Sequence, residues 1–178
     1  MKRKKLYLTV YSSVFAALIC VCTAVISIPL PAGGYAHLGD GLVLLSGIML
    51  PLPYAAAAAG IGSALADIFS GYVIYAPITF VIKALCAIVV FLLFKLLRKL
   101  PVALKLILSG LVAELLMVGG YLFAEAVILG YGLGALGGIF GNSMQGCVGI
   151  AVCLVLYFAL RKTPLIPKSG NQSVDKTS

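Results

Sequence analysis

The chain has 178 residues, of which 62% are hydrophobic and 10% are charged, and its formal net charge is +8. A soluble domain of this length has no core large enough to hide so much apolar surface, which excludes the soluble globular class. The basic residues flank long apolar stretches and form no continuous patch, so they indicate membrane topology and not nucleic-acid binding.

Six apolar spans follow one another in the chain, which predicts an all-α integral membrane protein built as a six-transmembrane-helix bundle. The first span is longer than the apolar core of a signal peptide, so we expect it to remain as a helix. The second is shorter than the hydrocarbon core of a bilayer requires. This membrane domain covers residues 1–163, and we expect the polar tail at 164–178 to be disordered and cytoplasmic. The spans are predicted at residues 6–28, 38–50, 54–70, 77–97, 106–129 and 137–160.

Three basic clusters determine the predicted orientation of the helices. They lie at the amino terminus, between residues 95 and 105, and from residue 161 onward. The loops expected on the opposite side, at 29–37, 71–76 and 130–136, contain no lysine or arginine. Under the positive-inside rule, six spans place all three clusters in the cytoplasm, whereas five or seven would leave one outside. We therefore predict that both termini are cytoplasmic.

Polar residues from several spans fall at a similar depth near the outer side. With a rise of about 1.5 Å per residue, Asp67 lies roughly 6 Å and Lys83 roughly 9 Å below the outer ends of their spans. Lys83 is the one basic residue inside an apolar span away from a cluster or chain end. A charge in that position is costly unless it has a partner. We predict an outward-facing pocket lined or braced by Tyr35, His37, Asp40, Asp67, Tyr72, Tyr75, Lys83, Glu125, Asn142 and Gln145, with Tyr121 and Tyr131 at the same level.

These polar groups also have purely structural explanations. Asp67 and Lys83 could form a charge-neutralising pair that holds two helices together. Asn142 and Gln145 lie on one helical face and could form interhelical hydrogen bonds. The tyrosines could belong to the aromatic belt at the bilayer interface. Glu114 lies deeper than the other acids and is harder to assign.

Small residues recur every four positions in the first span. Such a stripe lets another helix approach closely, because small side chains allow the backbones to pack. The partner could be a helix of a second protein or another span of this chain. The predicted docking residues are Ser12, Ala16, Cys20 and Ala24.

The sequence contains few residues that could perform catalysis. It has one histidine, five acids, no phosphate-binding loop and no nucleophile–base motif. The five cysteines lie in apolar runs without metal-ligand spacing, so we interpret them as packing residues. We expect no enzyme activity and no cofactor. An outward-facing pocket in a chain without an energy-using motif predicts a protein that captures a solute and receives energy for transport from a partner.

Four segments carry a resemblance to a known family. Together they resemble the S components of energy-coupling factor (ECF) vitamin transporters, and the likeness extends from about residue 6 to 162. The stripe in the first span is similar to the surface that this family uses to contact its transmembrane partner. The segments are residues 34–40 (GYAHLGD), 60–67 (GIGSALAD), 71–77 (GYVIYAP) with Lys83, and 141–146 (GNSMQG).

The resemblance implies a multi-pass protein of a prokaryotic cell membrane that binds a water-soluble vitamin or precursor near its outer face. It also implies a transmembrane coupling subunit (T component), two ABC ATPases, and toppling in the membrane to release the substrate. The pyridoxine, hydroxymethylpyrimidine and riboflavin classes are the closest in likeness. A thiamine pocket of the usual type needs tryptophan, and the chain has none.

Two other functions remain open from the residues alone. A self-sufficient facilitator or proton-coupled carrier could use Glu114, Glu125 or Asp67 as proton sites. A membrane enzyme acting on lipid or isoprenoid should show paired acidic motifs such as D-x-x-x-D, and the sequence has none.

Overall fold

The computed structural model describes residues 2–25, 27–29 and 35–163, so the predicted tail at 164–178 lies outside the described residues. The described chain is helical apart from one short antiparallel hairpin, in which Ser27 pairs with His37 and Pro29 with Tyr35. The elements are α1 (Lys2–Ala24), β1 (Ser27–Pro29), β2 (Tyr35–His37), α2 (Gly39–Met49), α3 (Leu52–Phe69), α4 (Ala76–Leu96), α5 (Val102–Phe123), a π-helical turn η1 (Ala124–Ile128), a 3-10 turn η2 (Gly132–Gly137) and α6 (Gly138–Leu160).

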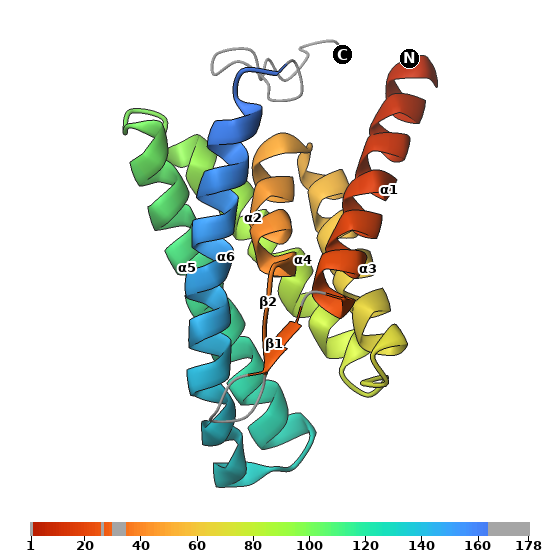
Figure 1. Cartoon of the computed structure of the whole chain (residues 1–178), viewed down its shortest axis with the longest axis vertical. Coiled ribbons are helices and arrows are strands. Elements are labelled where there is room, and N and C mark those ends of the chain that lie inside the picture. Colours follow the sequence, from red (N-terminus) through yellow and green to blue (C-terminus); the bar gives the residue numbers. More distant parts are fainter. Residues whose placement is uncertain (1, 26, 30–34, 164–178) are drawn as a thin grey trace.

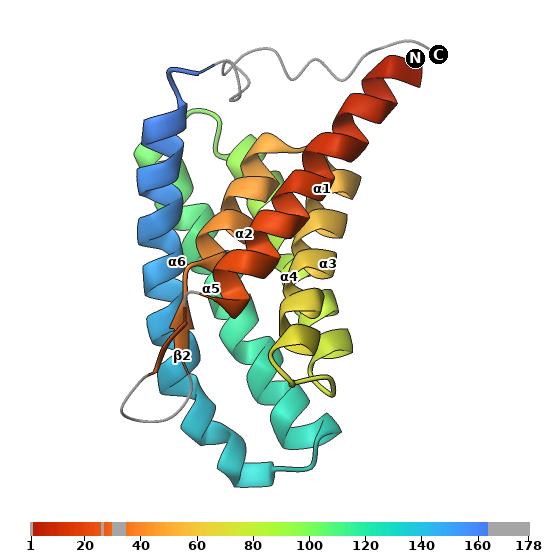
Figure 2. The same ribbon diagram turned by 45° about the vertical axis from the view of Figure 1, so that its right-hand side comes forward.

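Successive helices alternate in direction. The amino end of α1, the α2–α3 turn, the α4–α5 loop and the carboxyl end of α6 lie at one end of the bundle (Figure 1). The α3–α4 and α5–α6 connections lie toward the other end (Figure 2). The three predicted basic clusters are therefore near one end, which agrees with the pattern used to predict the topology.

By length and composition, five helices within the described residues can cross a membrane, so the prediction of six full spans is not confirmed for the second of them. The remaining helix, α2, has 11 residues, and every one of them is buried. At 1.5 Å per residue it is about 16 Å long, roughly half of a 30 Å hydrocarbon core. It packs against α1, α3, α4 and α6 in the centre of the bundle. A helix that is apolar on all sides suits such a buried position.

The predicted first span is also shortened at its end. We expected helix to residue 28, but α1 ends at Ala24 and Ser27 begins a strand. The segment from Val25 to Pro29 holds three β-branched residues before the proline, which favours an extended backbone. The hairpin takes up the residues that would otherwise extend α2 at its amino end.

The small stripe of α1 faces the protein itself. Gly62 of α3 lies so close to α1 that an added Cβ would be 2.5 Å from the backbone oxygen of Ala16. Cys20 is buried, while Ser12, Ala16 and Ala24 are half-buried. This matches the alternative in which the stripe packs against another span of the chain. The exposed face of α1 instead carries larger apolar side chains, at Leu6, Val10, Val14, Leu18 and Val21.

The orientation across the membrane stays a prediction, and cysteine labelling checks it. In a variant without the native cysteines, a cysteine at position 100 should react with an impermeant maleimide only after the cells are opened. A cysteine at position 73, where Val73 is exposed in the α3–α4 loop, should react in intact cells. Labelling of position 100 from outside would invert the topology.

Candidate substrate-binding site

A cavity of about 510 Å³ lies within the bundle, on the side of the α3–α4 and α5–α6 connections. This volume is within the range of about 300–1,000 Å³ that small-molecule sites occupy. Its wall is formed by side chains from every long helix, from the hairpin and from the η1–η2 segment. The lining residues are Thr23, His37, Ser63, Asp67, Tyr72, Tyr75, Thr79, Lys83, Tyr121, Glu125, Tyr131, Gly137, Gly138, Gly141, Asn142 and Gln145.

The inner wall of the cavity is built around Asp40, which lies in the first turn of α2. The Lys83 Nζ donates to Asp40 Oδ1 at 2.5 Å, and the Gln145 Nε2 donates to Asp40 Oδ2 at 2.6 Å. Lys83 also contacts Met117 Sδ at 2.8 Å and lies 5.6 Å from the centre of the Tyr121 ring. Asp40, Lys83 and Gln145 are all buried. The helix dipole favours a carboxylate at this end of α2.

This pairing decides against one alternative left open by the sequence. Lys83 could have formed a charge-neutralising pair with Asp67, but its salt bridge is with Asp40. Asp40 does not line the cavity and instead holds two residues that do. Asp67 lines the cavity separately, and its Oδ2 has no hydrogen-bond partner in the part of the chain that the structure describes.

Tyrosines form much of the wall near the helix connections. The Tyr75 hydroxyl donates to Glu125 Oε1 at 3.5 Å, and the Tyr72 and Tyr75 rings meet edge to face at 6.4 Å. Thr79 and Tyr121 share a hydrogen bond of 2.9 Å. Burial, with the nearby Tyr131 and Glu125, raises the pKa of the Tyr75 hydroxyl, so this group stays neutral. The wall thus offers aromatic faces with hydroxyl groups attached.

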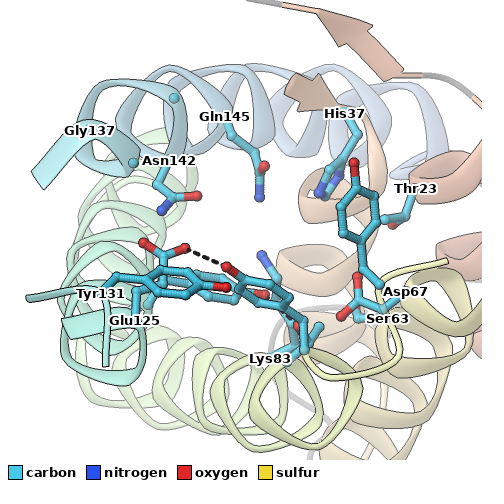
Figure 3. A pocket seen from close by; sticks show the side chains of 16 residues that line it. Thr23, His37, Ser63, Asp67, Lys83, Glu125, Tyr131, Gly137, Asn142 and Gln145 are labelled. Atoms are coloured by element: carbon cyan, nitrogen blue, oxygen red, sulfur yellow. Dashed lines mark hydrogen bonds between the residues drawn. The ribbon is translucent and has the colours of Figure 1, made fainter. Parts of the chain in front are cut away.

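Two groups of side chains face each other across the cavity in Figure 3. Thr23, His37, Ser63 and Asp67 lie on one side, and Glu125, Tyr131 and Asn142 lie on the other. Gln145 and Lys83 lie between the two groups.

His37 contributes a neutral imidazole to the wall. Burial, together with the Lys83 cation, lowers its pKa to about 4 against the opposing effect of Asp40, so the ring is uncharged near neutral pH.

Eight of the ten predicted pocket residues line the cavity: His37, Asp67, Tyr72, Tyr75, Lys83, Glu125, Asn142 and Gln145. Asp40 lies behind it, and the Tyr35 side chain lies outside the described residues.

The sequence reasoning missed Thr23, Ser63 and Thr79. Ser63 precedes Asp67 by four residues and Thr79 precedes Lys83 by four, so helical spacing could have indicated both. Thr23 lies in the last turn of the apolar helix α1, and no comparable pattern marks it.

Glu114 lies deeper and does not line the cavity. It is 6% exposed, and its Oε2 has no hydrogen-bond partner among the described residues. Gly146 and Gly149 of α6 leave the space that its side chain occupies, since a Cβ at either position would lie within 3.3 Å of Glu114.

Comparisons with known proteins agree with this geometry. Residues 3–162 match the family described as ECF-type riboflavin transporter, S component. An uncharacterized protein encoded in the gap 3′ region of Pyrococcus woesei is 30% identical over 145 residues, which are 81% of this chain and 95% of that protein. The solved S component of a bacterial ECF transporter has the same fold, with a TM-score of 0.64, 20% identity, and coverage of 91% of this chain and 98% of that one. The chain belongs to the S component family of ECF-type riboflavin transporters and is a substrate-binding subunit of a membrane transporter.

Proposed function

We propose that this protein captures riboflavin, or a vitamin of the same class, for an ECF-type importer. The observation that carries the proposal is the 510 Å³ cavity, in which four tyrosines and a set of buried polar groups surround one space. Tyrosine faces suit a planar heterocycle, and a few convergent polar groups fix its orientation.

The size of the cavity supports riboflavin over the smaller candidates. Good sites bury about 70–90% of a ligand and leave little unfilled space around it. Pyridoxine and hydroxymethylpyrimidine have one ring each and would leave much of this cavity empty. The tricyclic ring of riboflavin and its ribityl chain suit the space better, and the matched family is described by the same vitamin.

Transport would depend on partner proteins. The sequence contains no phosphate-binding loop, so energy from ATP has to come from other subunits. We propose a T component and two ABC ATPases as these partners, in a prokaryotic cell membrane. The predicted docking residues Ser12, Ala16, Cys20 and Ala24 remain untested in that role, and the exposed apolar face of α1 beside them is the larger available surface.

Riboflavin binding to the purified protein tests the proposal. Titration in detergent, followed by quenching of flavin fluorescence, should give a Kd below about 1 μM, equivalent to roughly −8 kcal/mol. Pyridoxine and hydroxymethylpyrimidine, each at about 100-fold excess, should not displace the flavin. Displacement by either compound, or failure of riboflavin to bind, would assign the cavity to another substrate.

The buried Glu114 favours one second candidate, a proton-coupled carrier that works alone. Glu114 is 6% exposed, its Oε2 has no hydrogen-bond partner among the described residues, and carriers place proton sites at such buried acids. Liposomes that contain only this protein distinguish the two functions. Uptake driven by a proton gradient would favour the carrier, whereas uptake that requires the ATPases and ATP would favour the importer.

A further inference from the structure

One side of the cavity carries polar atoms without partners among the described residues. Thr23 of α1 and Ser63 and Asp67 of α3, which we call the α1–α3 subsite, are 6%, 2% and 7% exposed, and all three line the cavity. The Thr23 Oγ1 and the Asp67 Oδ2 have no hydrogen-bond partner in the described part of the chain. Buried polar atoms are nearly always hydrogen-bonded, so we expect a ligand to supply the hydrogen-bond partners of these two oxygens.

The helices hold these oxygens along one wall. Ser63 and Asp67 are four residues apart, so their side chains lie one above the other on α3. Thr23 lies beside them on α1 (Figure 3), and α1 and α3 are in close contact at Gly62 and Ala16. The wall therefore presents two hydroxyl groups and a carboxyl group in succession.

The hydrogen-bonding capacity of this wall indicates what it can bind. Each hydroxyl of Thr23 and Ser63 can donate once and accept, while an ionised Asp67 only accepts. Lys83, the lysine that lines the same cavity, is already paired with Asp40. A matching ligand group must bring several donors together with acceptors, and a chain of hydroxyl groups has this property. A ring edge with one N–H between two carbonyl groups satisfies this wall only if both hydroxyls donate, whereas the hydroxyl groups of a chain can pair with it as donors or as acceptors.

The opposite side of the cavity suits a ring. Tyr131, Glu125 and Asn142 lie there (Figure 3), and the hydroxyl of Tyr75 donates to Glu125. We propose that the α1–α3 subsite binds the polyhydroxylated chain of the ligand, with Asp67 accepting hydrogen bonds from its hydroxyl groups. The ring system then lies against the tyrosines. This inference rests on the proposed function, because riboflavin carries such a chain on a planar ring.

Two flavins that differ only in the chain provide the test. Riboflavin carries the ribityl chain, and lumiflavin has the same ring with a methyl group in its place. We expect Asp67→Asn to weaken riboflavin binding by about tenfold or more and lumiflavin binding by less than about threefold. Thr23→Val, which keeps the side-chain shape and removes the hydroxyl, should produce the same difference with a smaller factor. This second variant keeps the test decisive if Asp67→Asn does not fold.

Glu125→Gln, on the opposite side, is the matched control and should change the affinities for both flavins by similar factors. Equal weakening of both flavins by Asp67→Asn and Thr23→Val, or no change in either, would overturn the assignment of the chain to this subsite. If the wild-type protein still binds riboflavin tightly in that case, the proposed function stands and only the subsite assignment fails. If the wild-type protein bound neither flavin, the proposed function would fail and this inference with it.

Discussion

Lys83→Met should destabilise the protein by about 3–5 kcal/mol and abolish measurable substrate binding. The substitution keeps most of the side-chain volume but removes the cation that neutralises Asp40, which is 1% exposed. A carboxylate left alone in that environment is costly, and within the described chain Gln145 would be its one remaining side-chain hydrogen-bond partner. A thiol-reactive dye measures the unfolding, since the buried Cys86 and Cys153 become accessible as the bundle opens.

Two further variants distinguish the loss of the ion pair from the general effect of replacing a buried lysine. Lys105→Met changes another buried lysine, whose ammonium lies over the Phe94 ring at 4.6 Å, and it should cost about 1 kcal/mol. The double variant Lys83→Met with Asp40→Leu removes both charges and should be more stable than Lys83→Met alone. Additive losses in the double variant would show that the two charges do not depend on each other.

Gly62→Ala should destabilise the bundle by about 1–3 kcal/mol and weaken substrate binding at the same time. The new methyl group would lie 2.5 Å from the Ala16 oxygen and 3.0 Å from the Ala16 Cα, and backbone atoms cannot move aside like a flexible side chain. Helix α1 must therefore shift away from α3. Thr23 is on α1 and lines the cavity, so the shift also changes the site.

Gly119→Ala is the matched control for this prediction. Gly119 lies in α5, and an added Cβ there would meet nothing within 4 Å. Because alanine is the better helix former by about 1 kcal/mol, the control should be neutral or slightly stabilising. Thermal unfolding and flavin titration of both variants check the pair. A Gly62→Ala protein that matches the control in both measurements would contradict the close α1–α3 packing.

Hydropathy and charge in the sequence predicted most of the helical order. The long apolar runs gave the positions of α3, α4 and α6 to within a few residues, because length and composition largely determine whether a segment is helical in lipid. They could not predict the end of α1, where residues 27–29 form a strand. Pairing with β2 decides that local structure, and hydropathy contains no information about it.

Depth along a helix predicted the layer of the site but not its pairings. Asp67 and Asp40 were both placed near Lys83 by depth, and only the packing of α2 in the centre brings Asp40 into contact with the lysine. Rise per residue gives a height, whereas a contact also requires the rotation of each helix and the identity of its neighbours. For the same reason the sequence alone left the direction of the α1 stripe open.

The short length of α2 has a consequence for how ligand and fold depend on each other. Helix α2 begins at Gly39, and the two partners of Asp40 in its first turn, Lys83 and Gln145, line the cavity, so the cavity lies beyond the amino end of this helix. The hairpin and the cavity together take the place of the two or three turns that a full-length helix would have supplied to the interior. A turn added before Gly39 would reduce the available volume while leaving Asp40 and its ion pair with Lys83 in place. In this chain the volume left for a ligand thus depends on the length of one helix, independently of the charged groups beneath the ligand.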